Sequence, residues 1–385
     1  MALSGYPSEP TVYTGTAVPM NVTTLLTHTT QKYIPKLRMS AFSATPFLRM
    51  LALQAWGSKA ALGDARYGNV TKTSGKGIVF NQGGYQTSSA FFTTSTSGSL
   101  VGRMAEINPT FLQPGSSVAY SWVRYVLSLG IPEEFIKDNV GSARLLDRLK
   151  TDLKIGQASA VTDLSYMALG HSSAPTGSPF GLTKLVSVTQ SSSVNPGGID
   201  PDAVTAWANC FTPVTSVGGG GELDRPLSLL RKMESFRIRL RSFAESSGDY
   251  VLVGTPGAFQ YYLRAAYADG VANQGLRNQG MYDSSIDHAV FGGSPFMYDG
   301  NVTVPEGATA STDAIYFLDL NELGLNIKAN EYFEQEGWTA PATKDRQRFY
   351  QANLWLRMVP FVTLRRIQGV LYNLPANPDV ITSNG

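Results

Sequence analysis

The sequence predicts an α+β fold in two folded units, and three patterns lead to this prediction. A helical pattern runs from Pro132 to Gly170. Stretches rich in β-branched and aromatic residues, separated by Gly- and Ser-rich turns, come before and after it, as expected of strands. From residue 176 to residue 328, strands alternate with two amphipathic helices, which is typical of a separate α/β unit. The order of these patterns predicts a long helix that is joined to a second unit.

The composition indicates a protein that forms extensive contacts with copies of itself. Charged residues make up only 16% of the 385 residues, whereas about 25% is usual in soluble domains. A monomer needs charge on its surface to stay solvated. We therefore expect the chain to bury much of its surface in a homo-oligomer, and its length is sufficient for two hydrophobic cores.

Several classes of function are disfavoured by simple counts. The 31 basic and 29 acidic residues give a net charge of +2, which argues against tight binding of nucleic acid through its phosphates. Cys210 is the only cysteine, so neither an internal disulfide nor a cysteine-based zinc site is expected. No apolar run of about 18 residues is present to span a membrane, and the first residues do not resemble a signal peptide. We expect no cofactor and no membrane association.

Residues 1–63 are predicted to form an N-terminal arm and one short helix. The first 44 residues are rich in Thr, Ser and Pro with weak periodicity, so we expect an extended arm that becomes ordered on partners. Pro46 then opens a helix, "PFLRMLALQAW", with Phe47, Leu48 and Leu51 on one face.

Residues 64–115 are predicted to form a long β-hairpin. The strand-like runs "GIVFNQ", "SSAFFTTST" and "LVGRMAEI" are separated by Gly-Gly, Ser-Gly and Gly-Lys-Gly turns. Too few large apolar residues are present for a core of its own. We therefore expect this hairpin to lie on another part of the protein or on a neighbour.

Residues 116–175 are predicted to hold a strand and then the long helix. The run "SVAYSWVRYVLSLGI" reads as a strand, and Pro132 with Glu133 and Glu134 reads as a helix start, because Pro suits the first turn and acids suit the positive end of the helix dipole. Gly170 is expected to end the helix. Its buried stripe is predicted at Leu145, Leu149, Leu153, Val161, Leu164 and Ala168.

Residues 176–328 are predicted to form the second unit. One helix begins at Pro226 with Asp224 as its cap, and its buried stripe is predicted at Leu227, Leu230, Met233, Phe236, Leu240 and Phe243. "YVLVGTP" reads as a strand before the helix "PGAFQYYLRAAYADG", and "AVFGGSPFMYDG" and "AIYFLDLNEL" as later strands. Residues 329–375, with "NLWLRMVPFVTLRRI" and "GVLYNL", are expected to return to the first unit, and 376–385 form a tail.

In this order, the pieces resemble tailed-bacteriophage major capsid proteins of the Hong Kong 97-like fold. The matching pieces are "SWVRYVLSLGIPEEF", the long helix through "DLSYMALG", "PFGLTKLV", "GGID", the Trp-Ala-Asn at residues 207–209, "LLRKM", "YVLVGTPGAFQYY", "FGGSPFMYD", "AIYFLDL" and "RRIQGVLYN". Each motif alone is weak, and the specificity comes from their order and spacing over residues 45–374.

The resemblance implies a domain plan. Residues 1–63 would be the N-terminal arm with its short helix, and 64–115 the E-loop, an extended hairpin that lies across the adjacent subunit. Residues 116–175 and 329–375 would form the P-domain with its spine helix. Residues 176–328 would form the A-domain, an α/β unit around the capsomer axis.

The resemblance also implies a function. The chain would be a major capsid protein whose hexamers and pentamers close into an icosahedral shell. That shell would enclose double-stranded DNA without sequence-specific binding, in a virion assembled in the cytoplasm of the host cell. Portal and decoration proteins are possible partners. Some family members carry a scaffolding segment of about a hundred residues before the arm; we expect none here, so that any scaffolding is a separate protein.

Candidate intersubunit contacts are basic or amide side chains. The helix after residue 225 carries Arg231, Arg237 and Arg241 among its basic residues, and Arg365 and Arg366 are adjacent later in the chain. The planar fork of Arg suits bidentate pairs with carboxylates of a neighbour. Some family members also join an E-loop Lys to an Asn of a neighbour, for which the candidates here are Lys72 and Lys76 with Asn353, although such polar tips are more often only solvated.

No catalytic or metal-binding residues are expected, and the protein is predicted not to be an enzyme. "GHSSA" at residues 170–174 imitates a nucleophile elbow, but a helix precedes it where that motif requires a strand. His28, His171 and His288 are far apart in the sequence. Two alternatives stay open: an encapsulin-like nanocompartment shell protein, and a serine hydrolase using Ser172 or Ser173 with His288.

Overall fold

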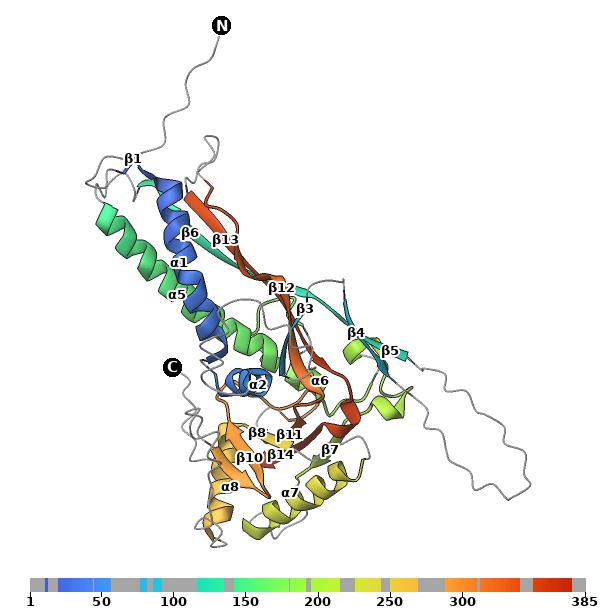
Figure 1. Cartoon of the computed structure of the whole chain (residues 1–385). Coiled ribbons are helices and arrows are strands. Elements are labelled where there is room, and N and C mark those ends of the chain that lie inside the picture. The colour runs from blue at the N-terminus through green and yellow to red at the C-terminus, as the bar shows by residue number, and fades with distance from the viewer. Residues whose placement is uncertain are drawn as a thin grey trace, which may run out of the picture.

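The structure is a computed structural model that describes residues 11–12, 20–43, 45–56, 77–81, 86–91, 116–134, 142–179, 181–191, 195–214, 226–243, 250–268, 288–309, 312–339 and 349–375. Figure 1 shows two sheets, one beyond the other along the molecule, with the helices α1 and α5 beside the first and α7 and α8 beside the second. Short strands β1 (Thr11–Val12) and β2 (Met20–Asn21) pair antiparallel ahead of α1.

The first sheet has four strands that come from distant parts of the chain. Their order is β3-β12-β13-β6. Only β3 and β12 are parallel, and the other neighbours are antiparallel. The bounds are Gly77–Asn81 for β3, Leu323–Gln335 for β12, Phe349–Val362 for β13 and Val123–Pro132 for β6. The predicted strand "GIVFNQ" is therefore present, but it extends this sheet and is not part of the hairpin.

The long helix is α5, Ser142–Leu169, and it packs along one face of this sheet. Of its predicted stripe, Leu149, Leu153, Leu164 and Ala168 are buried. A Cβ added at Gly156 would lie 3.4 Å from the side chains of Leu127 and Leu129 on β6, which is van der Waals contact, so α5 packs directly on this strand.

The predicted start of the helix is confirmed only in part. Pro132 is the last residue of β6, opposite Phe349 of β13, and α5 begins ten residues later at Ser142. Residues 133 and 134 are helical, and residues 135–141 lie outside the described residues. A proline fits the end of an edge strand as well as it fits a helix start, because neither position needs its N–H.

The N-terminal arm contains a helix that the sequence did not indicate. α1, Val22–Ser43, has Pro35 inside it and is rich in Thr, so its helical propensity is poor. Tertiary contacts hold it instead. The Trp338 indole N–H donates to Thr30 Oγ1 at 3.0 Å, and Arg38 Nε donates to the Tyr332 carbonyl at 2.8 Å. The Tyr332 hydroxyl donates back to the Arg38 carbonyl at 2.7 Å.

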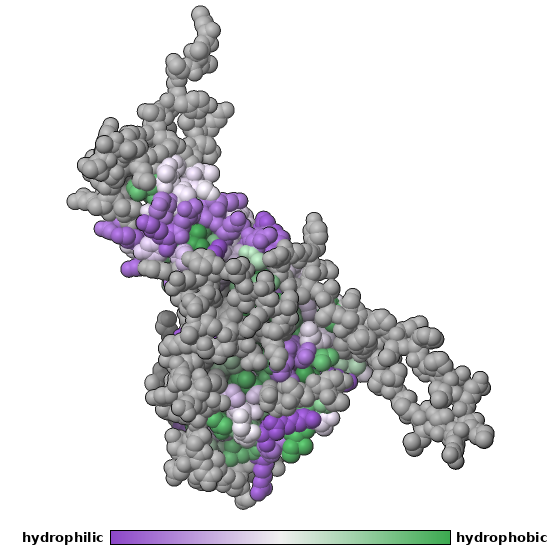
Figure 2. Space-filling view, in the orientation of Figure 1, coloured by the Kyte–Doolittle hydropathy of each residue, from purple (hydrophilic) through white to green (hydrophobic). Residues whose placement is uncertain are grey.

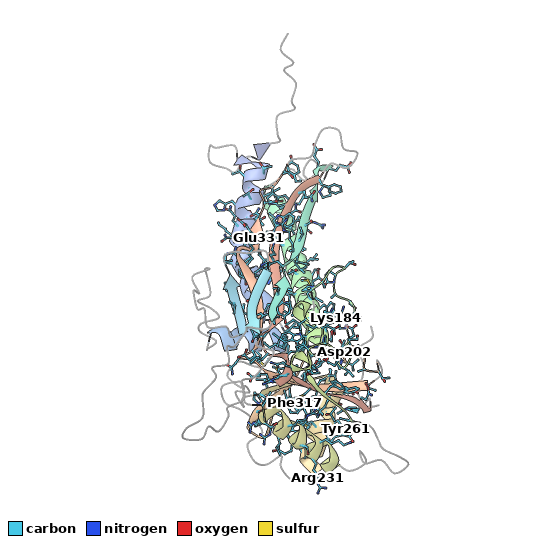
Figure 3. The ribbon with its side chains drawn as sticks, turned by 90° about the vertical axis from the view of Figure 1, so that its right-hand side faces the viewer. Lys184, Asp202, Arg231, Tyr261, Phe317 and Glu331 are labelled. Atoms are coloured by element: carbon cyan, nitrogen blue, oxygen red, sulfur yellow. The ribbon has the colours of Figure 1, made fainter. Side chains whose placement is uncertain are left out.

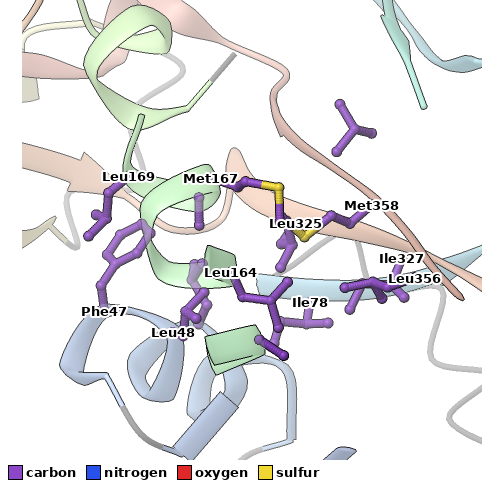
Figure 4. Packing of buried hydrophobic residues seen from close by; sticks show 14 of the residues in the cluster. Phe47, Leu48, Ile78, Leu164, Met167, Leu169, Leu325, Ile327, Leu356 and Met358 are labelled. Carbon is purple, nitrogen blue, oxygen red and sulfur yellow. The ribbon is translucent and has the colours of Figure 1, made fainter. Parts of the chain in front are cut away.

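The short helix predicted from Pro46 is confirmed as α2, Pro46–Trp56. Its predicted apolar face is buried, with Phe47, Leu48 and Leu51 each 2% exposed or less. Figure 4 shows Phe47 and Leu48 packed under the end of α5, near Leu164. One core therefore joins α2, α5 and the four-stranded sheet.

A buried carboxylate from the second unit caps α2. Asp299 Oδ2 accepts the Phe47 N–H at 3.1 Å, and Oδ1 accepts the Asn301 N–H at 3.0 Å. Asn301 Nδ2 donates to Ser165 Oγ of α5 at 3.0 Å. The turn at residues 299–301 thus ties α2 and α5 to the second sheet.

Burial raises the pKa of the Asp299 carboxyl above its ordinary value of 3.8, although the N–H donors of Asn301 and Phe47 oppose the shift. A raised pKa in the folded state favours folding while the group is protonated, and this contribution is lost as the pH rises through the folded value. We expect the unfolding free energy of wild type to fall with rising pH above 3.8 relative to Asp299→Asn. Denaturant titrations of both proteins across this range test it, and parallel pH profiles would contradict it.

The second sheet has six strands in the order β7-β14-β11-β8-β10-β9. The bounds are Cys210–Pro213 for β7, Gly369–Pro375 for β14, Thr312–Asp319 for β11, Tyr250–Gly254 for β8, Ser294–Tyr298 for β10 and His288–Phe291 for β9. Helices α7, Pro226–Arg241, and α8, Pro256–Ala268, belong to this unit as predicted. Asp224, the expected cap of α7, lies outside the described residues.

Both faces of the second sheet are covered. On β11, Ile315 and Phe317 belong to the core under α7 and α8, whereas Tyr316 and Leu318 belong to the core shared with the first unit. The strand "GVLYNL" was expected to return to the first unit, but as β14 it pairs with β11 and β7. Val370 and Leu371 are successive residues of β14 and point to opposite faces of the sheet. Val370 lies in the core shared with the first unit and Leu371 in the core under α7 and α8, so β14 needs a central place in a sheet that is covered on both sides.

The described residues include two paired strands at the base of the predicted hairpin. β4, Gln86–Phe91, pairs antiparallel with β5, Ser116–Ser121, and both stand to one side of the two sheets (Figure 1). Residues 92–115, including the predicted strand "LVGRMAEI", lie outside the described residues. None of the described helices is long and apolar enough to cross a membrane.

Candidate intersubunit surfaces

One face of α7 points away from the protein. Met233, Phe236 and Leu240 of the predicted stripe are buried, whereas Arg231 and Arg241 are exposed on the other side. Figure 3 shows Arg231 projecting beyond the ribbon at the end of the molecule, and Figure 2 shows hydrophilic side chains gathered over α5 and α7.

Ile238 lies on the same outer face of α7 and is 60% exposed. Arg231 and Arg241 are therefore placed where a neighbouring subunit can reach them.

Arg237 was predicted to contact a neighbour, but its charge is used inside the subunit. Its side chain is 14% exposed, and Nη2 pairs with Glu234 Oε1 at 2.7 Å. Nη1 donates to the carbonyl of Gly292, and the guanidinium lies 5.7 Å from the centre of the Phe291 ring. Arg237 thereby holds the turn between β9 and β10 against α7.

We expect Arg237→Ala to lower the unfolding free energy of the unassembled subunit by about 1 kcal/mol, because the carbonyl of Gly292 loses its charged donor. Arg231→Ala on the same helix is the matched control and should change it by less than about 0.5 kcal/mol. Equilibrium unfolding in urea measures both. Equal stability of the two variants would return Arg237 to the set of candidate contacts.

Arg365 was also predicted to contact a neighbour, and the structure contradicts this, because the side chain is 0% exposed. It lies in the short helix η5, Arg365–Ile367. Nε donates to the Leu185 carbonyl at 2.7 Å, Nη2 to Ser187 Oγ at 2.8 Å and Nη1 to Gln190 Oε1 at 3.2 Å. Burial lowers its pKa to about 10, partly opposed by Tyr120, so the guanidinium remains charged at neutral pH.

Arg365 belongs to a buried polar network that joins the motifs named in the sequence. Gln190 Nε2 donates to Asn209 Oδ1 at 2.8 Å, and Asn209 Nδ2 donates to the Ser187 carbonyl at 2.9 Å. The neighbouring Trp207 is fully buried, and its indole N–H donates to the Pro196 carbonyl at 3.0 Å. The runs "PFGLTKLV", "GGID" and Trp-Ala-Asn therefore meet "RRIQ" at the junction of the two units. Their role in this subunit is structural.

The other residues predicted to contact a neighbouring subunit lie in different parts of the chain. The Arg366 guanidinium lies 5.6 Å from the Phe243 ring centre, at the end of α7. Asn353 of β13 makes two side-chain hydrogen bonds. Its Oδ1 accepts a hydrogen bond from Ser128 Oγ at 2.9 Å, and its Nδ2 donates one to Glu336 Oε2 at 3.3 Å. Lys72 and Lys76 lie outside the described residues, so the structure does not test a crosslink between either of them and Asn353.

The structure does not place Ser172 and Ser173 in the geometry that the serine hydrolase alternative requires. Both follow the C-terminus of α5, after Gly170 at φ +75°, whereas a nucleophile elbow needs a strand before the serine. His171 stacks on Tyr166 with ring centres 4.4 Å apart, and its Nδ1 accepts the Ser173 backbone N–H at 3.0 Å. Burial lowers the pKa of His171. His288, the expected partner, begins β9 in the second unit.

No other catalytic arrangement stands out in the described residues. They contain no group of three His, Cys, Asp or Glu side chains that could hold a metal ion. A groove of about 590 Å³ runs beside β5, and of the described residues that line it Lys184 alone is charged. Its Nζ is 4.0 Å from Glu306 Oε2. A groove with one lysine lacks the paired groups that acid–base catalysis uses.

No family model matches the sequence, and no curated protein does either. Solved structures that match the chain include the capsid asymmetric unit of Cyanophage A-1(L), 13% identical over 77% of this chain and 90% of that chain, with a TM-score of 0.49. The capsid of a native GTA particle is 12% identical over 78% and 88%, with a TM-score of 0.48. The holo-SrpI encapsulin from Synechococcus elongatus is 13% identical over 68% and 76%, with a TM-score of 0.40. At these values, the likeness by itself assigns no function to the chain.

Proposed function

We propose that this chain is a major capsid protein, which assembles with copies of itself into the icosahedral shell around the double-stranded DNA of a tailed bacteriophage. The observation that carries the proposal is the plan of the molecule. A 28-residue helix is laid along a four-stranded sheet, that sheet shares its core with a second α/β unit, and a hairpin stands away from both (Figure 1). This plan supports the resemblance that the order of the sequence motifs suggests.

The work of such a protein is assembly and involves no chemical step. A two-stranded hairpin is at best marginally stable alone, so β4 and β5 gain from lying on a neighbour. Interfaces of obligate assemblies bury thousands of Å², which fits a chain with only 16% charged residues. Closed symmetry then ends the assembly at a finite particle.

In this proposal the domain plan follows the family. Residues 1–63 and 64–115 are the arm and the E-loop, and 116–175 with 329–368 the P-domain. Residues 176–328 are the A-domain, to which β14 (Gly369–Pro375) adds a strand by pairing with β11 and β7. The hairpin base at β4 and β5, the close packing of α5 on β6, and the compact six-stranded unit support these divisions. Arg231, Arg241 and Arg366 are the cations proposed to meet neighbouring subunits. Scaffolding, portal and decoration proteins would be separate partners in the virion.

The test is the size and content of the natively expressed, purified protein. Electron microscopy should show closed shells or capsomers, and the ratio of absorbance at 260 and 280 nm should report nuclease-protected DNA inside particles from infected cells. Shells filled with protein cargo and free of nucleic acid would favour an encapsulin-like nanocompartment. A stable small species that never assembles would overturn the proposal.

A further inference from the structure

The N-terminus of α2 lies at the boundary between the two units. α2 packs on α1, α5 and β3 of the first unit, and Figure 1 shows it between α5 and the second sheet. Its first residue, Pro46, has no N–H to donate. The N–H groups of Phe47 and Leu48 therefore need acceptors that the carbonyls of the helix cannot supply.

Thr45 occupies the N-cap position of this helix. Its carbonyl accepts the Arg49 N–H at 2.9 Å, which is the first hydrogen bond of the helical ladder. Threonine is a favourable N-cap residue, because its hydroxyl oxygen can accept the N–H of the second or third helical residue. In α2 these are Phe47 and Leu48. The local sequence thus provides a cap for α2.

The Thr45 hydroxyl is not used as that cap in this structure. Thr45 is 9% exposed, and its Oγ1 is buried with no hydrogen-bond partner among the described residues. Asp299 Oδ2 of the second unit accepts the Phe47 N–H instead, at 3.1 Å and from 252 residues away in the chain. The unused hydroxyl destabilises this arrangement, because its oxygen has left water without gaining a donor.

The cap from Asp299 also has an unfavourable component. The carboxylate is 1% exposed, and its two oxygens serve one donor each, the Phe47 N–H for Oδ2 and the Asn301 N–H for Oδ1. Burial raises the pKa of this carboxyl, and the two N–H donors offset the shift only in part. Transfer of the Phe47 N–H to Thr45 would satisfy the buried hydroxyl, which brings the free energies of the two arrangements closer together.

We propose that Asp299 and Thr45 are alternative N-caps of α2, and that the Phe47 N–H passes from one to the other when the second unit moves away from α2. The pair is a releasable tie between the two units. α2 stays capped by the second unit while the tie is made, and by its own N-cap residue once it is released. Rotation of the Thr45 side chain about χ1 is the local change that the transfer requires. The inference concerns the subunit alone and does not rest on the proposed function.

The first test is an experimental structure of the Asp299→Asn variant. An amide has one acceptor oxygen where a carboxylate has two, so the new side chain cannot serve both N–H donors. Asn301 is two residues away in the same turn and should keep that oxygen. We expect Thr45 Oγ1 to lie within about 3.2 Å of the Phe47 nitrogen in this variant. A Thr45 hydroxyl that bonds only to water, or a Phe47 N–H that still donates to residue 299, would contradict the proposal.

The second test is a double-mutant cycle on the unassembled subunit. Thr45→Val keeps the shape of the side chain and removes its hydroxyl. In wild type it should change the equilibrium constant of unfolding by less than about twofold, because the hydroxyl is unused. In Asp299→Asn it should raise that constant about fivefold, as expected when a helix loses its N-cap. Urea unfolding measures all four proteins.

Thr45→Ser is the matched control, because it keeps the hydroxyl. Its effect should agree between the two backgrounds within about twofold. Equal effects of Thr45→Val in wild type and in Asp299→Asn would overturn the inference. So would a fivefold loss already in wild type, because the hydroxyl would then hold a donor there. If Asp299→Asn does not fold, Thr45 cannot replace the cap and the inference is wrong. None of these results bears on shell formation, which the assembly experiment tests.

Discussion

Replacing Arg365 with methionine is expected to lower the unfolding free energy of the isolated subunit by about 3 kcal/mol. The substitution removes three donors from a site with no access to water and leaves the Leu185 carbonyl, Ser187 Oγ and Gln190 Oε1 without this partner. Buried polar networks are costly when they are only partly satisfied. Urea unfolding of the unassembled subunit, followed by circular dichroism, gives the change.

Arg231→Met is the matched control, because Arg231 is exposed at the end of α7 and its loss should change stability by less than about 0.5 kcal/mol. The pair also decides between two roles for Arg365. A variant that unfolds like wild type but assembles poorly would restore the intersubunit role that the sequence suggested. A less stable subunit would place the arginine in the junction between the two units.

Replacing Gly197 with alanine is expected to cost about 3 kcal/mol and to loosen the base of the hairpin. Gly197 has φ +69° in the short helix η1, Pro196–Gly198. A Cβ there would overlap a methyl group of Val118 on β5 and lie 3.3 Å from the Tyr120 ring. Tyr120 is itself fixed, since its hydroxyl donates to the Val362 carbonyl at 2.9 Å, so the strand cannot give way easily.

Gly198→Ala is a close control, because Gly198 has φ +77° but nothing lies within 4 Å of its added Cβ. The Gly198→Ala variant has no steric overlap, so it loses only the about 1 kcal/mol that a positive φ costs a residue with a Cβ. Thermal unfolding should therefore rank wild type, Gly198→Ala and Gly197→Ala in falling order of stability. In assembly assays, Gly197→Ala should also form particles less readily than Gly198→Ala. Equal melting temperatures for the two variants would show that η1 does not support the hairpin.

These residues suggest how the subunit can be both rigid and able to reach its neighbours. The junction of the two units is fixed by Arg365 and by Trp207. In the proposed shell, the exposed end of α7 and the hairpin, which lie away from this junction, would contact other copies. If the chain forms the proposed shell, a rigid centre of this kind would keep the angle between subunits defined.

The sequence by itself determined the elements whose signals are local. α2 begins at Pro46 as predicted, and the buried stripes of α5 and α7 agree with their helical spacing. The hairpins and strands of the second unit follow from β-branched runs between turns. Periodicity and turn chemistry act within a few residues, so one sequence is enough to show them.

Tertiary structure decided what depends on distant partners. α1 is a helix because Trp338 and Tyr332 hold it, and its own Thr-rich sequence favours no such structure. Pro132 ends a strand because β13 lies beside it. Arg365 is buried and Arg124 is exposed, although the sequence suggested the first as a contact and did not single out the second. Whether an arginine faces a neighbour or the interior depends on which carbonyls and carboxylates the fold brings to it. Those lie up to 294 residues away in the chain, as Arg38 and the Tyr332 carbonyl do.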